Sequence, residues 1–291
     1  EIFVFSNDPE ADLFNVRFSN LGPNQGNYVL SSQDAIANIY EYVSPVEGVP
    51  QGNFEPVVRL FAPTKLQIAM LNGAYTPSAK TTLQFEVAAS NNDDNLFSGL
   101  DQGDNKGLAT QASVRQRIFE TDKNQQLDVF ANLNFIENSY TSIERLYNVE
   151  FTRDWNLFNP TGDQLFVDTG FDFRSNLESI SRYRFQRLAY TNDFEGLKHN
   201  ISIRQIQDNF KLDANASYLD SESSLLTSKF ARANVSGIYD FKALWSGLRF
   251  DMEDNQEVLL EDERFTPNTQ RFSSYEIFSG VGDSTTVYVE V

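Results

Sequence analysis

The chain has 291 residues, no cysteine and a formal net charge of −18, with 41 acidic against 23 basic side chains. This balance excludes a general field that attracts nucleic acid phosphates. The absence of cysteine excludes a disulfide framework, a zinc ribbon and a thiol nucleophile. Aromatic residues make up 13% of the chain, more than a disordered acidic tail carries, so the charge belongs to a folded protein.

The first part of the chain differs from the rest. Proline and glycine interrupt its short apolar stretches, which prevents long regular strands. We therefore predict a small, loop-rich β section over residues 1–64 and a larger β unit over residues 65–291. Because the chain starts with Glu1 and stops within the strand-like run 285–291, we expect it to be a segment of a longer protein.

From residue 65 onward, apolar and polar residues alternate with a period of two. In residues 127–135, for example, Leu127 and Val129 share one face, while Asp128 and Asn132 share the other. This pattern is typical of half-buried strands, and it predicts an all-β antiparallel meander of about twelve strands. It recurs in residues 66–70, 83–87, 171–173, 183–187, 210–216 and 248–252.

The predicted connections alternate in length. Short turns are expected at residues 77–80, 121–125, 174–178, 208–209, 240–242 and 282–284, and long loops at residues 91–107, 138–163 and 253–271. Outer-membrane β-barrels have short turns at one end, long loops at the other, and strands that alternate apolar-out and polar-in. No run of about 18 apolar residues occurs, so a membrane could be spanned here only by a barrel.

A soluble β-sandwich or extended sheet remains open, because the same alternation then separates core from solvent. The mean hydropathy of −0.42 does not decide between the two, since half of each barrel strand faces a wet lumen.

Four stretches resemble large, mostly uncharacterised outer-membrane and cell-surface proteins of Bacteroidota: residues 21–28, 39–57, 90–109 and 148–155. The resemblance implies an envelope location, an outer-membrane β-barrel and a polypeptide much longer than this one. It implies no catalytic residue.

The chain has a single histidine, His199, so any Ser-His-Asp device would have to use it. We expect it at a junction between a loop and a strand, without a nucleophile-elbow pattern nearby. We predict that the protein is not an enzyme.

A calcium site is one hypothesis for the acidic loop between residues 91 and 107. Its candidate ligands are Asp93, Asp94, Asp101, Asp104 and Asn105. Calcium prefers several carboxylate and amide oxygens in a flexible turn, but the spacing is not that of an EF-hand. An ordinary loop in which these residues bond their own backbone is the competing interpretation.

Charged and aromatic side chains suggest two further features. Arginines could face aspartates across a lumen, with Arg182, Arg184, Arg187 and Arg204 opposite Asp128, Asp172 and Asp213. Aromatics could mark a membrane interface at Tyr75, Tyr140, Tyr147, Trp155, Tyr190, Tyr218, Tyr239 and Trp245.

The function expected from these patterns is that of a structural, binding or transport component of the Gram-negative outer membrane. Its partners would be outer-membrane lipid and other envelope proteins or glycans. The alternative is a soluble periplasmic or cell-surface binding module for glycan or protein, with calcium as a possible cofactor.

Overall fold

The computed structural model describes residues 2–33, 38–58, 60, 62–100, 103–191, 193–242, 244–282 and 289–290. The chain divides into two compact units, unit 1 (Glu1–Pro63) and unit 2 (Thr64–Val291). The predicted all-β class is confirmed, since the one helix among these residues is the four-residue α1 (Phe151–Asp154). No helix in the described part of the chain is long and apolar enough to cross a membrane.

Unit 1 is a small antiparallel sheet with the strand order β1-β4-β2-β3. An aromatic cluster forms its core, because the ring of Phe18 stacks on Tyr40 at 4.4 Å and meets the buried Tyr28 edge-on at 4.7 Å. The proline- and glycine-rich sequence gives short strands, as expected. They are β1 (Ser19–Asn20), β2 (Tyr28–Gln33), β3 (Asn38–Tyr42) and β4 (Phe54–Glu55).

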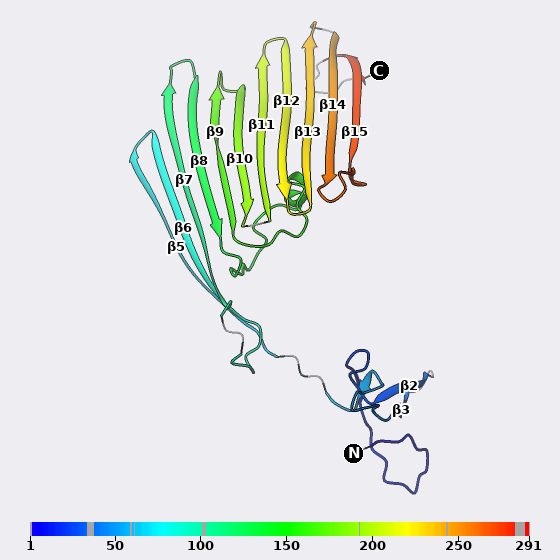
Figure 1. The fold of residues 1–291 in the computed structure, drawn as a ribbon. Coiled ribbons are helices and arrows are strands. Elements are labelled where there is room, and N and C mark those ends of the chain that lie inside the picture. The colour runs from blue at the N-terminus through cyan, green and yellow to red at the C-terminus, as the bar shows by residue number, and fades with distance from the viewer. Residues whose placement is uncertain are drawn as a thin grey trace. The chain divides into compact units, whose positions relative to one another are not determined.

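Unit 2 is one antiparallel sheet in which each strand pairs with the next along the chain, so the predicted meander is confirmed (Figure 1). The two-residue β16 (Val289–Glu290) pairs with β15 and completes a twelve-stranded sheet. The long strands are β5 (Lys65–Ser78), β6 (Thr81–Asp93), β7 (Lys106–Glu120), β8 (Gln126–Ile136), β9 (Gln164–Arg174), β10 (Ile180–Tyr190), β11 (Phe194–Gln207), β12 (Phe210–Ser223), β13 (Leu226–Asp240), β14 (Leu244–Leu259) and β15 (Gln270–Val281).

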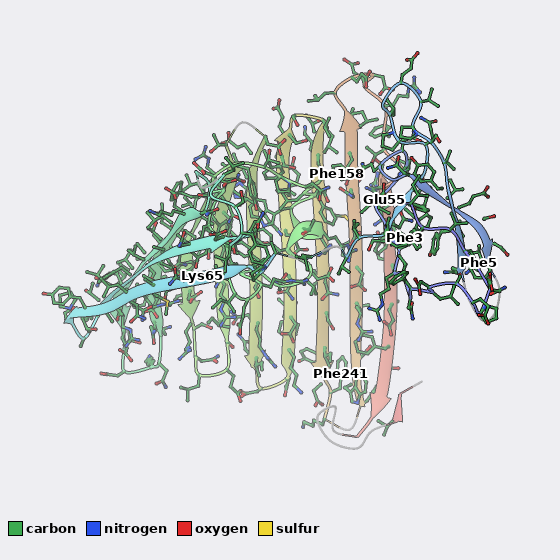
Figure 2. All side chains as sticks on the ribbon, turned by 90° about the horizontal axis from the view of Figure 1, so that it is seen from below. Phe3, Phe5, Glu55, Lys65, Phe158 and Phe241 are labelled. Carbon is green, nitrogen blue, oxygen red and sulfur yellow. The ribbon has the colours of Figure 1, made fainter. Side chains whose placement is uncertain are left out.

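The two ends of the sheet carry different connections. At the turn end, where Phe241 lies (Figure 2), the strands are joined by residues 79–80, 121–125, 175–179, 208–209 and 241–243. At the loop end, the connections are residues 94–105, 137–163, 191–193, 224–225 and 260–269. The predicted loop 253–271 is shorter than expected, because β14 continues to Leu259.

The register of the sheet assigns each side chain to one of two faces, since directly paired residues of antiparallel strands lie on the same face. We call the face on which α1 lies the inner face and the opposite one the outer face. The inner face carries most of the charged and amide side chains of the strands. On most strands the two faces therefore separate polar from apolar residues as the alternation in the sequence predicts. The exception is β5, whose apolar residues Leu66, Ile68 and Met70 lie on the inner face.

An apolar band crosses the outer face of all the long strands on the side of the turn end. Its side chains remain accessible, most of all Tyr275 and Ile277 on β15, which are 79% and 80% exposed. From β5 to β15 the band includes Leu71, Tyr75, Leu83, Phe85, Val87, Ala112, Val114, Val129, Ala131, Leu133, Phe171, Phe173, Tyr183, Phe185, Ile201, Ile203, Leu212, Ala214, Ala216, Ala233, Val235, Leu248, Phe250, Met252, Tyr275 and Ile277.

The strands are staggered as well as paired. Following direct pairs across the sheet, Leu83, the third residue of β6, shares a row with Asp254, the eleventh residue of β14, eight strands further on. The row therefore climbs by one residue per strand. With about 3.4 Å per residue and 4.8 Å between strands, this stagger corresponds to a strand tilt of about 35°. Barrels have tilts in this range.

Unit 1 depends on glycine where two backbone segments cross. A Cβ on Gly26 would lie 2.4 Å from the carbonyl oxygen of Phe54. We expect Gly26→Ala to destabilise unit 1 by about 1–3 kcal/mol, because backbone has to move to relieve the clash. Hydrogen exchange of residues 2–58 measures this change. Gly99→Ala is the control, since a Cβ there meets nothing within 4 Å; equal exchange in the two variants would contradict the prediction.

Candidate functional site

The longest connection of the sheet, loop 137–163, lies on the inner face rather than extending away from it. Its residue Trp155 is buried in a cluster with Leu188 of β10 and Leu219 of β12. Gly196 on β11 makes room for the indole, since a Cβ there would lie 3.1 Å from the Trp155 ring. The otherwise polar inner face thus contains an apolar cluster against which this loop packs. Two further buried members of this apolar cluster are Phe194 and Phe230.

Aromatic stacking fixes the segment that leads into α1. The rings of Tyr147 and Phe151 stack with centroids 4.0 Å apart. The hydroxyl of Tyr147 accepts a hydrogen bond from the side-chain amide of Gln164, which also accepts one from the hydroxyl of Tyr190 at 2.8 Å. Burial raises the pKa of Tyr147, and the hydrogen bond from Gln164 partly opposes this shift.

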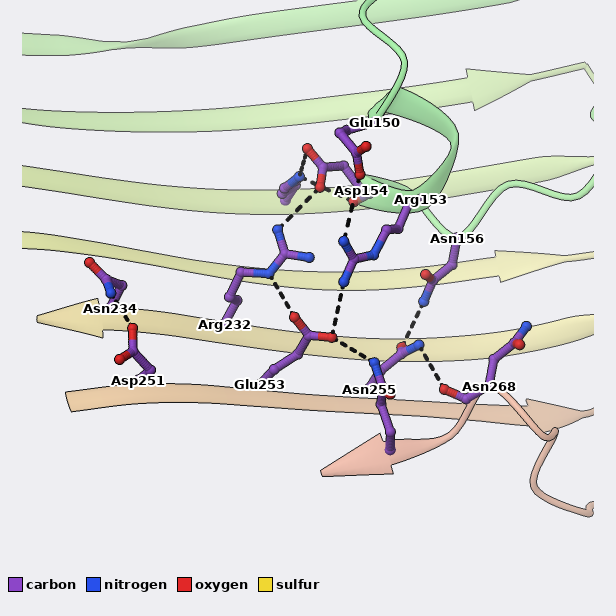
Figure 3. A network of polar contacts seen from close by, with 12 residues as sticks. Glu150, Arg153, Asp154, Asn156, Arg232, Asn234, Asp251, Glu253, Asn255 and Asn268 are labelled. Carbon is purple, nitrogen blue, oxygen red and sulfur yellow. Dashed lines mark hydrogen bonds and ion pairs between the residues drawn. The ribbon is translucent and has the colours of Figure 1, made fainter. Parts of the chain in front are cut away.

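A network of charges binds α1 to strands β11, β13 and β14 (Figure 3). The carboxylate of Asp154 lies 3.3 Å from Arg232 and 3.8 Å from Lys198. The carboxylate of Glu253, which is buried, lies 3.2 Å from Arg232 and 3.4 Å from Arg153. A buried carboxylate is stable only when it is paired, so Glu253 requires the loop and β13 together.

Amide groups extend this network to loop 260–269. Asn156 donates hydrogen bonds to the hydroxyl of Ser228 at 2.5 Å and to the side-chain oxygen of Asn255 at 2.8 Å. Asn255 in turn donates to the backbone oxygen of Asn268 at 3.3 Å (Figure 3). Loops 137–163 and 260–269 are therefore joined through β14.

Asp193 ties three connections of the loop end together. Its carboxylate accepts hydrogen bonds from the hydroxyl of Ser224 at 2.8 Å and from the backbone N–H of Thr161 at 2.9 Å. These bonds lower the pKa of Asp193, the one from Ser224 having the larger effect.

A second charged cluster lies on the inner face of β7 to β10. Asp172 on β9 is 3.1 Å from Arg115 and 3.7 Å from Arg182. On the same row, Asp128 lies 3.2 Å from Arg117, and further along β9 Asp168 lies 3.6 Å from Arg184.

Three of the four arginines considered in the sequence lie on the inner face as predicted. Arg182 and Arg184 meet aspartates, and Arg204 lies 3.7 Å from Asp213. Arg187 lies on the outer face, beside Glu195 at 2.8 Å, because it is separated from Arg184 by an odd number of residues.

Two other expectations from the sequence are wrong. His199 lies within β11 on the outer face, not at a junction, and its ring Nδ1 is 2.8 Å from the hydroxyl of Tyr183. Trp155 and Trp245 are buried on the inner face, and Tyr190 also lies on that face, so these three are not interfacial aromatics.

The candidate calcium ligands make local bonds. Asp93 accepts a hydrogen bond from the backbone N–H of Asn95 at 3.0 Å, and Asp94 accepts one from the side chain of Asn92 at 2.9 Å. Asn105 contributes its backbone oxygen to Asn92 at 2.7 Å, and Asp104 is exposed. Asp101 lies outside the described residues. No group of three or more His, Asp or Glu side chains in the described ranges could hold a metal ion, and calcium binding stays a prediction.

Sequence reasoning missed the contacts of Arg153, Asp154 and Glu253. No local pattern marks them, because the residues are up to 100 positions apart and meet only when the loop folds back.

No family model, curated protein or solved structure matches the chain.

We expect Arg232→Gln to release loop 137–163, because it removes ion pairs to both Asp154 and Glu253. Hydrogen bonds to charged groups contribute about 1.5–3 kcal/mol each, so trypsin cleavage at Arg145 and Arg153 is expected to accelerate at least tenfold. Arg264→Gln is the matched control, since Arg264 pairs with Asp262 but is largely exposed. A loop that stays equally resistant in both variants would show that the charge network does not hold it.

The hydrogen bonds that Asp193 accepts from Ser224 and Thr161 are expected to weaken in acid. A depressed pKa gives stabilisation that is present above the unfolded value of about 3.9 and is lost as the pH falls through the lower folded value. Hydrogen-exchange protection of the Thr161 amide should therefore fall below about pH 4, and Asp193→Asn should make it lower and insensitive to pH. Asp208→Asn, at the turn end, is the control. Protection that does not change between pH 3 and 6 in the wild type would contradict this assignment.

Proposed function

We propose that unit 2 is part of the wall of a membrane-spanning β-barrel in the Gram-negative outer membrane. In this proposal the protein is a non-catalytic component in which polar solutes bind or pass along the inner face. The observation that carries the proposal is the apolar band on the outer face. The partner of this apolar band would be the hydrocarbon of outer-membrane lipid.

The height of the band supports this function. On β12 five consecutive outward residues, from Phe210 to Tyr218, are apolar or aromatic. They cover about nine residues, or roughly 30 Å along the strand. At a tilt of about 35° the band is then about 25 Å high along a barrel axis, which is the height of the apolar band of outer-membrane barrels.

The edge of the apolar band toward the loop end also supports a location in a membrane. Toward the loop end the outward positions become charged on successive strands, with Arg187 on β10, Glu195 on β11, Asp220 on β12, Lys229 on β13 and Asp254 on β14. Charged side chains are costly in the hydrocarbon core but not at its surface. A boundary of this kind is expected where the strands leave the lipid.

The extent of the band argues against the soluble alternative. Eleven strands at about 4.8 Å spacing make a surface about 50 Å wide and 25 Å high, or roughly 1,300 Å². Soluble monomers rarely expose contiguous apolar patches above about 300–600 Å². A soluble binding module would need a second layer over this face, yet Leu248, Tyr275 and Ile277 stay more than half exposed.

The inner face supplies the chemistry expected of a lumen. It is lined by paired charges and amides, and loop 137–163 folds onto it from the loop end. A loop held inside a barrel narrows the path that a solute can take. The resemblance to Bacteroidota envelope proteins supports the proposed location.

The test compares neighbouring residues on opposite faces of β11. We expect Ile201→Arg to prevent assembly, because an arginine facing mid-membrane lipid costs about 2–4 kcal/mol. Ser202→Arg, one residue away on the inner face, is the matched control and should assemble. The readouts are recovery of the full-length protein in the outer-membrane fraction and its heat-modifiable mobility on a gel.

A wild-type protein that remains soluble without detergent would contradict the proposal. Equal assembly of the two variants would contradict it as well, since the faces would then not differ in their surroundings.

A further inference from the structure

The inner face of β7 to β10 contains a basic platform. Direct pairing places Arg115, Phe130, Gly170 and Arg184 in one row across β7, β8, β9 and β10. Gly170 contributes no side chain to this row, so Phe130 is the only side chain between the two arginines. A Cβ at Gly170 would lie 2.0 Å from the carbonyl oxygen of Tyr183, so the close approach of the β10 backbone leaves no room for a side chain at this position.

The two arginines of this row are held over the same ring. The guanidinium carbons of Arg115 and Arg184 lie 5.5 Å and 5.3 Å from the centroid of the buried Phe130. Cation–π contacts of this kind orient a guanidinium while leaving its N–H edges for other partners. Arg182, on the next row, reaches toward the same area through Asp172, which it shares with Arg115.

Exposure separates the two signs of charge in this cluster. The side chains of Arg115, Arg182 and Arg184 are 48%, 48% and 46% exposed. Those of Asp128, Asp172 and Asp168 are 11%, 18% and 9% exposed. The carboxylates thus lie beneath the arginines, orient them and balance their charge, while the surface presented to solvent is made of guanidinium groups.

We propose that this platform, formed by Arg115, Arg182 and Arg184, binds the phosphate or carboxylate groups of anionic solutes. Arginine suits such ligands, because its planar N–H fork matches a phosphate or carboxylate with two parallel hydrogen bonds. The inference deepens the proposed function and rests on it, since it names the solute class that the inner face would receive.

The net charge of −18 does not oppose binding at this place. Half of the acidic excess lies in the loop-end connections 94–105, 137–163, 191–193 and 260–269, which contain 12 acidic and 3 basic residues. Arg184 is six residues and Arg115 nine residues from the loop end of their strands, or roughly 20–30 Å. The Debye length at physiological ionic strength is about 8 Å, so charges at the loop ends of these strands are screened at the platform. Loop 137–163 folds onto the inner face, but its Asp154 is paired there with Arg232 and Lys198.

The experiment is calorimetric titration of the full-length protein in detergent with inorganic pyrophosphate. We expect saturable binding that weakens with added salt, and a Kd at least tenfold higher in the double variant Arg115→Gln/Arg184→Gln. Arg115→Lys/Arg184→Lys should fall between them, because it keeps the charge but loses the fork. Arg204→Gln is the control, since Arg204 and its partner Asp213 are both more than half exposed and lie outside the platform; its Kd should stay within twofold of the wild type.

No pyrophosphate binding to the wild type, or a Kd unchanged in the double variant, would overturn the proposal. All variants are compared only after heat-modifiability shows that they assemble. A wild type that assembles in the outer membrane but does not bind pyrophosphate would remove this inference alone, and the proposed membrane function would stand.

Discussion

Antiparallel pairing is the constraint on which unit 2 depends. Residues that face each other across two strands lie on the same side of the sheet, and a slip of one residue would move every side chain to the other face. The register keeps apolar residues together from β5 to β15, over direct pairs such as Phe171 with Tyr183 and Val235 with Phe250. Backbone hydrogen bonds hold the sheet together, but the sorting of side chains decides what each face can contact.

The inner face meets a second constraint, since its buried charges need partners. Glu253 is compensated by Arg232 and Arg153, and the aspartates of β8 and β9 are compensated by arginines that reach across from β7 and β10. A loop folded onto such a face is held by directional contacts as well as by the burial of Trp155. The same arrangement leaves arginine edges toward solvent, and this links the packing of the face to its proposed binding of anions.

Much of the sheet could be predicted because the alternation reports directly on the two faces. The turns at 121–125 and 208–209 lie where the sequence predicts them. The prediction that a loop begins at Glu253 was wrong, because β14 continues to Leu259 and only the apolar band ends near Glu253. Outward Asp254 and Gln256 alternate with inward Glu253 and Asn255, so both faces are polar and the contrast that marks a strand disappears.

The site was less predictable for a related reason. Arg182 and Arg184 could be placed with Asp172 because they share a phase along neighbouring strands, and the same counting applied to Arg187 gives the outer face. The contacts of Arg153 and Asp154 follow instead from a loop that folds back over the five strands β10 to β14. That return is a tertiary event, and no periodicity in residues 137–163 reports it.

The central claim is that the outer face contacts lipid while the inner face contacts water. These 291 residues contain no cysteine, so a single cysteine introduced at each position from 200 to 204 of β11 gives one spin-label site in this chain, to be measured within lipid bilayers. The account predicts that labels at 201 and 203 collide with oxygen dissolved in the lipid, and that labels at 200, 202 and 204 collide with a water-soluble nickel chelate. Aqueous access at 201 and 203 equal to that at their neighbours would contradict it.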